Sequence, residues 1–464
     1  MGPKMQRKDF TNEMKADFEN LFGNQVSFSD PVLIAHGNGE SYHPVAKPDA
    51  VVFTQSTEDV SNAMKLCDKH SIPVIPFGTG TSLEGHVNAL FGGVTIDVSG
   101  MDQILEINEE DLDCRVQAGL TRIRLNEELR ATGLFFPIDP GADASIGGMA
   151  ATRASGTNAV RYGTMKDVVL GLTIVKPDGE VIKTGGRAKK SSAGYDLTRL
   201  YVGSEGTLGI ITEIQLRLFG QPEAVTAATC PFPDISSAIN TAMLVVQSGI
   251  PVARMELVCE KSIAAVNKYS KLSLAEQPTL FFEFHGTPAW AKEQAEMVGE
   301  IATEFGGEGF QWATELEVRN KLWAARHSMY HATRAAYPGC NGMTTDVCVP
   351  ISRLAEAMEQ AAELVEKHDV IAPIVGHVGD GNFHLAIMVD PDDEAHIKRA
   401  KAVSESLVEN ALALGGTCTG EHGIGYGKIG YLKAEHGGGV DVMAAVKAAL
   451  DPKGLMNPGK IIQA

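Results

Sequence analysis

Three glycine-rich segments interrupt the first half of this chain, and the second of them consists almost entirely of small residues. They span residues 76–86, 137–156 and 203–211. The chain has 49 glycines among its 464 residues, and they gather in short segments between apolar runs. Because glycine lets a backbone approach a ligand closely, this pattern favours a fold that binds a ligand against its main chain.

The charge balance and the apolar runs exclude several classes of partner. The 58 acidic and 40 basic residues give a net charge of −18, whereas a nucleic-acid binder needs a basic face. No apolar stretch reaches the ~18 residues of a spanning helix, and the first residues lack a signal-peptide core. Seven scattered cysteines without a CxxC pair indicate reduced thiols. We therefore expect no nucleic-acid partner, no integral membrane segment and a cytoplasmic location, with peripheral membrane association left open.

The residues from Ala50 to Leu218 carry a strand-rich pattern. Strands are expected at 51–53, 72–75, 94–98 and 115–118, with a helix beginning after Ser56 or Thr57 between the first two. Pro177-Asp178-Gly179 predicts a hairpin between strands 172–176 and 180–184. Residues 210–218 alternate as a half-buried strand does. Gly220-Gln221-Pro222 then breaks the pattern, which places a domain boundary there.

Helices and strands alternate from about residue 223 to residue 410. The expected helices are 235–248, 289–304, 315–335, 352–368 and 393–413, and the expected strands are 253–258, 279–285, 345–349, 371–378 and 383–389. This pattern predicts an antiparallel sheet covered by helices. The last residues add a glycine loop, a helix near 439–450 and an extended tail.

Each glycine segment taken alone has a plain structural explanation beside the functional one. Backbone N–H groups of residues 76–86 can converge on an anion, but Leu83 breaks the dinucleotide motif and His86 breaks the P-loop motif. A mobile glycine turn explains this segment equally well. Tight helix–sheet packing explains residues 137–156 as well as a flat ligand does, and a loop before a strand is the simpler explanation of residues 203–211.

Two histidines flank a turn in the second half of the chain. A two-residue turn at Asp380-Gly381 would set His377 opposite His384. Directly opposed side chains have Cβ atoms roughly 4.5–5.5 Å apart, which lets two imidazoles share one ion. A histidine pair that only fills the core or faces solvent is the alternative.

Glu421 and His422 follow within a glycine-rich stretch. Neighbours on a regular strand point to opposite faces, so these two side chains can serve one site only from an irregular loop. An exposed polar turn is the alternative for this stretch. Arg326 lies on a predicted helix, and taken alone it would be explained as a surface arginine.

In this order and spacing, the segments resemble the FAD-binding domain of the vanillyl-alcohol oxidase / p-cresol methylhydroxylase (PCMH) family. Residues 42–462 resemble the FAD-linked D-2-hydroxyacid dehydrogenases of that family. The cytochrome-type D-lactate dehydrogenases are the most similar branch, and D-2-hydroxyglutarate dehydrogenases and glycolate oxidase large subunits are related. The resemblance implies an α+β fold with a two-part PCMH-type FAD-binding domain at 42–221. It also implies an antiparallel-sheet cap domain at 222–410 with a metal site, and a C-terminal segment at 411–464 that returns to the FAD domain. The pattern of residues 1–41, which precede the resemblance, predicts a helical lead-in.

The resemblance implies FAD held without a covalent bond. His86 is the only histidine in its loop, and its segment does not resemble the attachment sites of covalent members. Gly78–Ser82 would cradle the pyrophosphate, and residues 140–148 and 155–159 would line the flavin and its linker. Glu205, Gly206, Ile210 and Ile211 would contact the adenine side. The residues assigned to FAD are Pro76, Gly78, Thr79, Gly80, Thr81, Ser82, Gly85, His86, Pro140, Gly141, Ala142, Asp143, Ser145, Ile146, Gly147, Gly148, Ser155, Gly156, Asn158, Ala159, Glu205, Gly206, Ile210, Ile211 and Asn457.

The resemblance also implies a metal-assisted oxidation of a D-2-hydroxyacid to the 2-oxoacid. His377, His384 and Glu421 would bind a divalent ion, with Zn²⁺ or Mn²⁺ favoured and Fe²⁺ also suitable. His422 would take the hydroxyl proton, since an unperturbed imidazole pKa of roughly 6.5 suits a general base, and the Cα hydride would pass to the flavin. Arg326 would bind the substrate carboxylate, and Asn382 would hydrogen-bond the substrate.

D-Lactate is the favoured substrate, with D-2-hydroxyglutarate and glycolate as alternatives. Hydroxyglutarate relatives carry a lysine in a segment that matches Thr344-Thr345-Asp346, and this chain has no cation there. The expected electron acceptor is cytochrome c, a quinone or an electron-transfer flavoprotein, and a homodimer is left open. A non-redox FAD-dependent transferase of the same fold and a flavin-binding subunit without catalysis are the competing functions.

Overall fold

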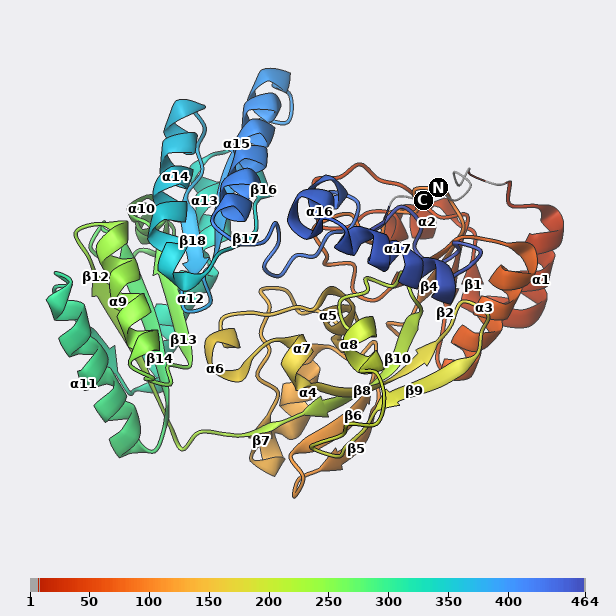
Figure 1. The fold of residues 1–464 in the computed structure, drawn as a ribbon, viewed down its shortest axis with the longest axis horizontal. Helices are drawn as coiled ribbons and strands as arrows, with labels where there is room; N and C mark the ends of the chain where they lie inside the picture. The colour runs from red at the N-terminus through yellow and green to blue at the C-terminus, as the bar shows by residue number, and fades with distance from the viewer. Residues whose placement is uncertain (1–6, 8, 463–464) are drawn as a thin grey trace. The chain divides into compact units, whose positions relative to one another are not determined.

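A computed structural model describes residues 7 and 9–462, which form two compact units (Figure 1). Unit 1 holds the described residues up to Ser155, together with Gly163–Gln221 and the described residues from Glu421 onward. Unit 2 holds Gly156–Tyr162 and Pro222–Gly420. The chain therefore passes between the units four times, and one of these excursions is only seven residues long.

The first sheet of unit 1 grows from a β-α-β unit, as the sequence predicts. Its strand order is β1 (Val26–Ser27), β2 (Ala50–Phe53), β4 (Val94–Asp97) and β3 (Val74–Phe77). β4 pairs in parallel with both β2 and β3, and β1 pairs antiparallel with β2. Helix α3 (Thr57–His70) joins β2 to β3 and begins where Ser56 and Asp59 cap each other's backbone.

The second sheet of unit 1 is antiparallel. Its order is β5 (Ile104–Asn108), β6 (Asp113–Gln117), β10 (Ile210–Arg217), β8 (Val169–Val175) and β9 (Val181–Gly185). Two short strands, β7 (Leu134–Phe135) and β11 (Phe219–Gly220), pair separately. Helix α3 packs against strands of both sheets, so one apolar core serves the whole unit.

Short helices complete unit 1, and the end of the chain joins its first sheet. The helices are α1 (Asn12–Phe22), α2 (Asp30–His36), α4 (Arg122–Glu128), α5 (Ile146–Thr152), α7 (Met165–Val168), α8 (Leu197–Tyr201), α16 (Ile429–His436) and α17 (Gly439–Leu450). Met456 forms a parallel bridge with Val74 of β3. The C-terminal segment is thus built into the sheet beside the first glycine segment.

Unit 2 is built on one large antiparallel sheet. Its order is β15 (Gln311–Ala313), β12 (Ala224–Pro231), β14 (Thr279–Gly286), β13 (Arg254–Val258), β18 (Ile374–His377), β19 (Asn382–Val389) and β16 (Asn341–Thr344). β17 (Val347–Cys348) also pairs with β19. This architecture and the fold of unit 1 confirm the predicted α+β class.

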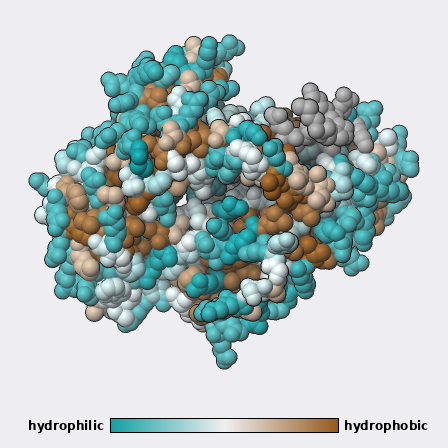
Figure 2. Space-filling model, viewed as in Figure 1, coloured by the Kyte–Doolittle hydropathy of each residue, from teal (hydrophilic) through white to brown (hydrophobic). Residues whose placement is uncertain are grey.

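Helices cover both faces of this sheet (Figure 1). α9 (Ile235–Gln247), α11 (Pro288–Glu304) and α14 (Leu354–Lys367) pack on one face, and α15 (Glu394–Ala413) packs against α14. On the other face, α10 (Glu260–Ser270), α12 (Leu316–His327) and α13 (Met329–Ala336) share an apolar cluster with Val258 and Phe281. The short α6 (Ala159–Tyr162) also belongs to unit 2. The outer sides of α14 and α15 are hydrophilic (Figure 2).

One predicted helix is divided in the structure. The sequence predicts a continuous helix over 315–335, but α12 and α13 meet at Ser328 instead. The Ser328 hydroxyl donates a hydrogen bond to the Ala325 carbonyl, and such local bonds compete with the helical pattern. Within residues 7 and 9–462, no helix is long and apolar enough to cross a membrane.

Candidate active site

The three glycine segments come together in unit 1. A Cβ atom at Gly78, in the first segment, would lie only 2.3 Å from the Oγ of Ser145, in the second. A Cβ atom at Gly206, in the third, would lie 2.7 Å from the Pro76 ring. Since contacts below 3.0 Å force a shift, these glycines are required by close packing of one segment on another.

Helix α5 carries the second segment and fixes the third. The Gly203 and Glu205 N–H groups donate to the Ala150 and Ala151 carbonyls, each at 2.9 Å. Within α5, a Cβ at Gly147 would lie 2.6 Å from the Ala118 Cβ, so the helix sits directly on the end of β6. The segment order that suggested a cofactor site therefore corresponds to one contiguous structure.

The first segment has the properties of an anion cradle. Ser82 Oγ and Ser145 Oγ are buried, and neither has a hydrogen-bond partner among the described residues. Gly80 has φ +72°, a conformation that glycine adopts at no steric cost. Buried polar atoms normally have partners, so two unpaired hydroxyl donors beside a glycine turn fit a ligand rich in oxygen acceptors, as a pyrophosphate is.

The residues predicted to bind FAD fall on both units. Unit 1 holds Pro76, Gly78, Thr79, Gly80, Thr81, Ser82, Gly85, His86, Pro140, Gly141, Ala142, Asp143, Ser145, Ile146, Gly147, Gly148, Ser155, Glu205, Gly206, Ile210, Ile211 and Asn457. Gly156, Asn158 and Ala159 belong to unit 2, where Asn158 Oδ1 accepts a hydrogen bond from Arg254 Nε at 3.0 Å.

A buried lysine that the sequence reasoning missed lies in the C-terminal segment. Lys460 is 2% exposed, and its Nζ donates to the Asn88 carbonyl at 2.7 Å and to Asn457 Oδ1 at 3.3 Å. Burial lowers the pKa of Lys460 to about 7, against the opposing charge of Glu205. The Asn457 N–H donates to the Val74 carbonyl, which fixes this segment beside β3.

The two predicted histidines lie together in unit 2, but the predicted register is wrong. His377 pairs with Asn382, and His384 pairs with Val375, across a four-residue loop rather than a two-residue turn. Gly381 serves a close approach instead, because its Cβ would lie 2.1 Å from the Val349 carbonyl oxygen. A shift of two residues keeps both imidazoles on one face. Their ring centroids lie 5.5 Å apart, and ring nitrogens of the two lie within 4.8 Å.

Hydrogen bonds fix the orientation of both imidazoles. Nδ1 of His384 lies 2.8 Å from the Thr345 carbonyl, which only accepts, so this nitrogen carries a proton. Nδ1 of His377 lies 2.7 Å from Glu256 Oε1. The Nε2 lone pair of each ring is then the one suited to a metal. Metal-ligating histidines are commonly held in this way, with the other ring nitrogen donating to a carboxylate or a backbone carbonyl.

Glu256 also binds the arginine predicted to hold the substrate. It is 0% exposed, and Arg326 Nε and Nη2 both donate to its Oε2, at 3.2 and 2.6 Å. Burial alone raises the pKa of Glu256, but the charges and hydrogen bonds of His377 and Arg326 outweigh it and hold the pKa below its ordinary value. The sequence reasoning missed Glu256, although an acidic residue inside a predicted buried strand was a usable signal.

Asn382 and Asp346 form a second buried polar group in unit 2. Asn382 Nδ2 donates to Asp346 Oδ1 and to the Val347 carbonyl, each at 2.8 Å, while Asn382 Oδ1 is buried without a partner among the described residues. Asp346 is 1% exposed, and its Oδ2 accepts from Thr419 Oγ1 at 2.7 Å. Thr419 therefore fixes the chain just before it leaves unit 2 at Gly420.

Glu421 and His422 begin the last segment of unit 1. Ser155 Oγ donates to Glu421 Oε2 at 2.7 Å, and His422 Nε2 lies 4.0 Å from Glu421 Oε1. These neighbours both follow Gly420 in an irregular stretch without helix or strand. This local structure satisfies the condition under which both side chains can serve one site.

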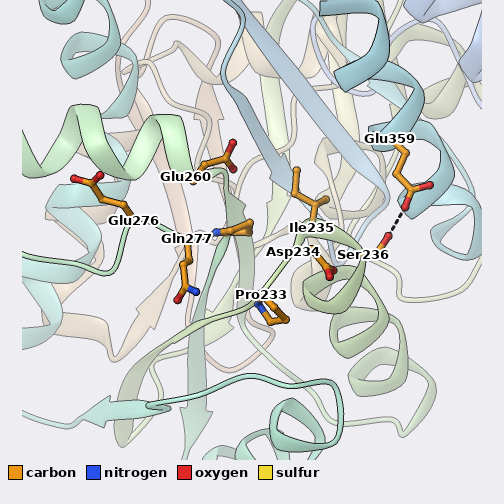
Figure 3. A pocket seen from close by; sticks show the side chains of 9 residues that line it. Pro233, Asp234, Ile235, Ser236, Glu260, Glu276, Gln277 and Glu359 are labelled. Carbon is orange, nitrogen blue, oxygen red and sulfur yellow. Dashed lines mark hydrogen bonds between the residues drawn. The ribbon is translucent and has the colours of Figure 1, made fainter. Parts of the chain in front are cut away.

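A separate hollow of about 570 Å³ on unit 2 carries none of the predicted site residues (Figure 3). Its nine lining residues include the carboxylates of Asp234, Glu260, Glu276 and Glu359, and no lysine, arginine or histidine. Ser236 Oγ donates to Glu359 across its rim.

Comparisons with known proteins identify the family. Residues 48–185 match a family model described as an FAD binding domain, and residues 221–461 match the C-terminal domain of FAD linked oxidases. The chain belongs to the FAD-linked oxidases of the vanillyl-alcohol oxidase / p-cresol methylhydroxylase family. It is accordingly an enzyme with FAD as its cofactor, which confirms the predicted resemblance.

Relatives and solved structures cover nearly the whole chain. A probable D-lactate dehydrogenase, mitochondrial, of Danio rerio is 49% identical over 97% of this chain and 91% of its own length. A D-lactate dehydrogenase (cytochrome), mitochondrial, of Arabidopsis thaliana is 44% identical over 99% and 82%. The structure of p-cresol methylhydroxylase with bound substrate has a TM-score of 0.79 at 17% identity, covering 99% of both chains, and shows the fold alone.

The expected cytoplasmic location is wrong. The Danio and Arabidopsis relatives are both named as mitochondrial proteins. Composition, charge and cysteine spacing indicate how the chain folds and whether its thiols are reduced. They do not distinguish the cytoplasm from a mitochondrion.

Removing the buried carboxylate tests the network around the histidine pair. Glu256→Ala should lower the free energy of unfolding of unit 2 by about 3–5 kcal/mol, because it leaves Arg326 buried without its partner. All three tryptophans, at 290, 312 and 323, lie in unit 2, so their fluorescence in a denaturant titration follows this unit.

The exposed ion pair of Arg353 and Glu356 supplies the matched control, with an N···O distance of 2.6 Å. Glu356→Ala should cost below about 1 kcal/mol. Equal losses in the two variants would show that the Glu256 network does not stabilise the sheet.

Proposed function

We propose that this enzyme oxidises D-lactate to its 2-oxoacid, with FAD as the hydride acceptor and a divalent ion beside the substrate. The observation that carries the proposal is the histidine pair, whose Nδ1 atoms are both engaged on one sheet face. The relatives named as D-lactate dehydrogenases, at 44% and 49% identity over nearly full length, support the choice of substrate.

FAD is proposed to bind noncovalently to the glycine segments of unit 1, with Gly156, Asn158 and Ala159 contributing from unit 2. When bound, it supplies the two-electron acceptor for the reaction. The hydroxyls of Ser82 and Ser145, which have no partner among the described residues, would donate to its phosphate oxygens. Because Gly78 has no Cβ, the Ser145 hydroxyl can lie against its main chain, and Gly80 adopts φ +72° without steric cost.

The divalent ion is proposed to bind His377, His384 and Glu421, and Zn²⁺ or Mn²⁺ suits two imidazoles and one carboxylate. When bound, such an ion lowers the pKa of a coordinated oxygen acid. The chain supplies Nε2 of both histidines in fixed orientation, since Glu256 and Thr345 hold the Nδ1 atoms. Ser155 in turn orients the Glu421 carboxylate.

His422 is proposed as the base that takes the substrate hydroxyl proton. Glu421 precedes it directly, so a ligand and a base are presented by one short stretch of chain. Asn382 Oδ1, buried without a protein partner, is the acceptor that we assign to the substrate.

Arg326 is proposed to bind the substrate carboxylate through one nitrogen. Its Nε and Nη2 both donate to Glu256, so Nη1 remains for the substrate. The polar atoms of Thr345 already have hydrogen-bond partners within the protein. Its Oγ1 accepts from the Leu385 N–H, and its carbonyl accepts from His384 Nδ1. With one arginine nitrogen and no lysine in the 344–346 segment, the site suits a monocarboxylate better than a dicarboxylate.

The electron acceptor for reduced FAD is proposed to be a cytochrome, as the name of the Arabidopsis relative indicates for that protein. A quinone or an electron-transfer flavoprotein is the alternative. Steady-state rates with each acceptor distinguish the three.

Anaerobic mixing tests the substrate directly. D-Lactate should bleach the flavin absorption band of the purified holoenzyme, while L-lactate at equal concentration should not, because the proposed site would present only one face of Cα to the flavin. D-2-Hydroxyglutarate and glycolate serve as comparison substrates. If D-lactate leaves the flavin oxidised while another hydroxyacid bleaches it, the substrate assignment is wrong.

Substitution of the base tests the chemistry. His422→Ala should lower kcat by about 10²–10⁴-fold, the usual contribution of a positioned general base, while FAD stays bound. His436→Ala is the control, because His436 lies on α16 of the same unit with a half-exposed side chain. Activity that survives His422→Ala at the level of the control would place the base elsewhere.

A further inference from the structure

The turn that follows His422 is held by a buried carboxylate of unit 1. Glu205 Oε1 accepts the Ile424 N–H, and Glu205 Oε2 accepts the Gly425 N–H, each at 2.7 Å. Two consecutive backbone donors thus bind the two oxygens of one side chain. Neither the glycine segments nor the motif around Glu421 indicates this contact in the sequence.

The Glu205 carboxylate is buried and charged. Its side chain is 4% exposed, and His86 Nε2 lies 3.0 Å from Oε2. Burial alone raises the pKa of Glu205, but the charge of the nearby His86 and the two backbone N–H groups outweigh it, so the pKa lies below its ordinary value. The bonds to Ile424 and Gly425 are therefore charge-assisted, which makes them shorter and stronger than neutral ones.

The turn fits against this carboxylate without spare room. Gly423 has φ +80°, and a Cβ there would lie 2.7 Å from Glu205 Oε1 and 2.9 Å from His86 Nε2. Gly425 has φ +49°, and a Cβ there would lie 1.9 Å from the Glu84 carbonyl oxygen. Gly423 and Gly425 are thus required by their contacts with Glu205 and Glu84.

Glu205 is itself fixed from two sides. Its N–H donates to the Ala151 carbonyl at the end of α5, and its carbonyl accepts from Asn457 Nδ2 at 2.8 Å. Its φ of +52° is unusual for a residue other than glycine. Such conformations persist where surrounding contacts hold them, and they gather at functional sites.

We propose that Glu205 is a positioning residue, which acts through the turn 423–425 to hold the His422 ring in place for proton transfer. This inference rests on the proposed function, in which His422 is the base. The carboxylate touches the backbone two and three residues beyond His422 and does not itself meet the substrate. A misplacement of about 1 Å can cost a factor of 10² in rate. Loss of the hydrogen bonds between Glu205 and the turn should therefore lower kcat.

Glu205→Gln keeps the shape of the side chain but turns one acceptor oxygen into a donor. One of the two backbone bonds is then lost, and kcat for D-lactate should fall about 100-fold with KM changed by less than about threefold. Because both carboxylate oxygens of Glu205 bind the turn, we assign Glu205 to the turn instead of the adenine contact that the resemblance implies, so FAD content and the flavin spectrum should stay as in the parent. Glu205→Asp, which keeps the charge, should recover part of kcat, and Gly423→Ala should reproduce the loss from the other side of the contact.

Asp113→Asn is the matched control for loss of a buried carboxylate in unit 1. Asp113 is 1% exposed on β6, and it accepts hydrogen bonds from Arg187, Asn108 and Gln215. This control should lose stability like Glu205→Gln while kcat stays at the parent value. A loss of FAD in Glu205→Gln, or a kcat equal to that of the control, would overturn the proposal.

A double variant separates positioning from a general structural effect. In a His422→Ala background there is no ring to position, so adding Glu205→Gln should cost no further activity. Groups that act as one unit show this non-additivity. A further fall in kcat of the double variant would mean that Glu205 acts by another route, and the proposal would fail.

Amide hydrogen exchange measures how firmly Glu205 binds the turn 423–425, and it does so without an activity assay. The Ile424 and Gly425 amide protons should exchange about tenfold faster in holoenzyme Glu205→Gln than in the parent, because local opening exposes them. Unchanged exchange would overturn the proposal even if D-lactate is the substrate. Faster exchange in an enzyme that oxidises a different acid would leave the hold of Glu205 intact and disprove only the proposed substrate.

Discussion

The interaction on which the site of unit 2 depends is the bridge that Glu256 makes between His377 and Arg326. A fully buried carboxylate is costly unless its partners compensate it, and here the imidazole binds one oxygen and the guanidinium binds the other. The bridge fixes which nitrogen of His377 is protonated. It also ties helix α12, which carries Arg326, to the sheet strand β13.

Unit 1 uses a second buried acid in a related way. Glu205 is paired with His86, and both of its carboxylate oxygens accept hydrogen bonds from backbone N–H groups. The carboxylate oxygens of Glu256 instead bind two side chains. In both places a charged group that costs free energy to bury is compensated by directional bonds. Such bonds specify geometry more tightly than apolar packing, which is suited to residues that must hold an imidazole within fractions of an ångström.

Much of the fold follows from patterns that the sequence shows openly. The β-α-β unit around α3 has an apolar helical face and a capping signal at Ser56. The alternating pattern of 210–218 correctly predicts a strand, but β10 is buried on both faces rather than half-buried. The three glycine segments are recognisable because close approach demands glycine at Gly78 and Gly206. The family resemblance, and with it the fold class, rests on these same residues.

The rest depends on contacts between distant segments that no local pattern encodes. Asp380-Gly381 has the signature of a two-residue turn, yet Gly381 is glycine because Val349 approaches it, and the register shifts by two. Glu256 and Glu205 acquire partners 121 and 219 residues away in the chain. The excursion of Gly156–Tyr162 into unit 2 likewise appears only in three dimensions.

Metal-edge X-ray absorption on the holoenzyme would detect the proposed ion and its ligands. We predict one divalent ion per chain, with two imidazole nitrogens at about 2.0–2.1 Å and a carboxylate oxygen at about 2.0–2.2 Å if the ion is zinc. His384→Ala should remove one imidazole from this shell while FAD stays bound. A fully active enzyme without bound metal, or an ion whose shell is unchanged in His384→Ala, would contradict the account.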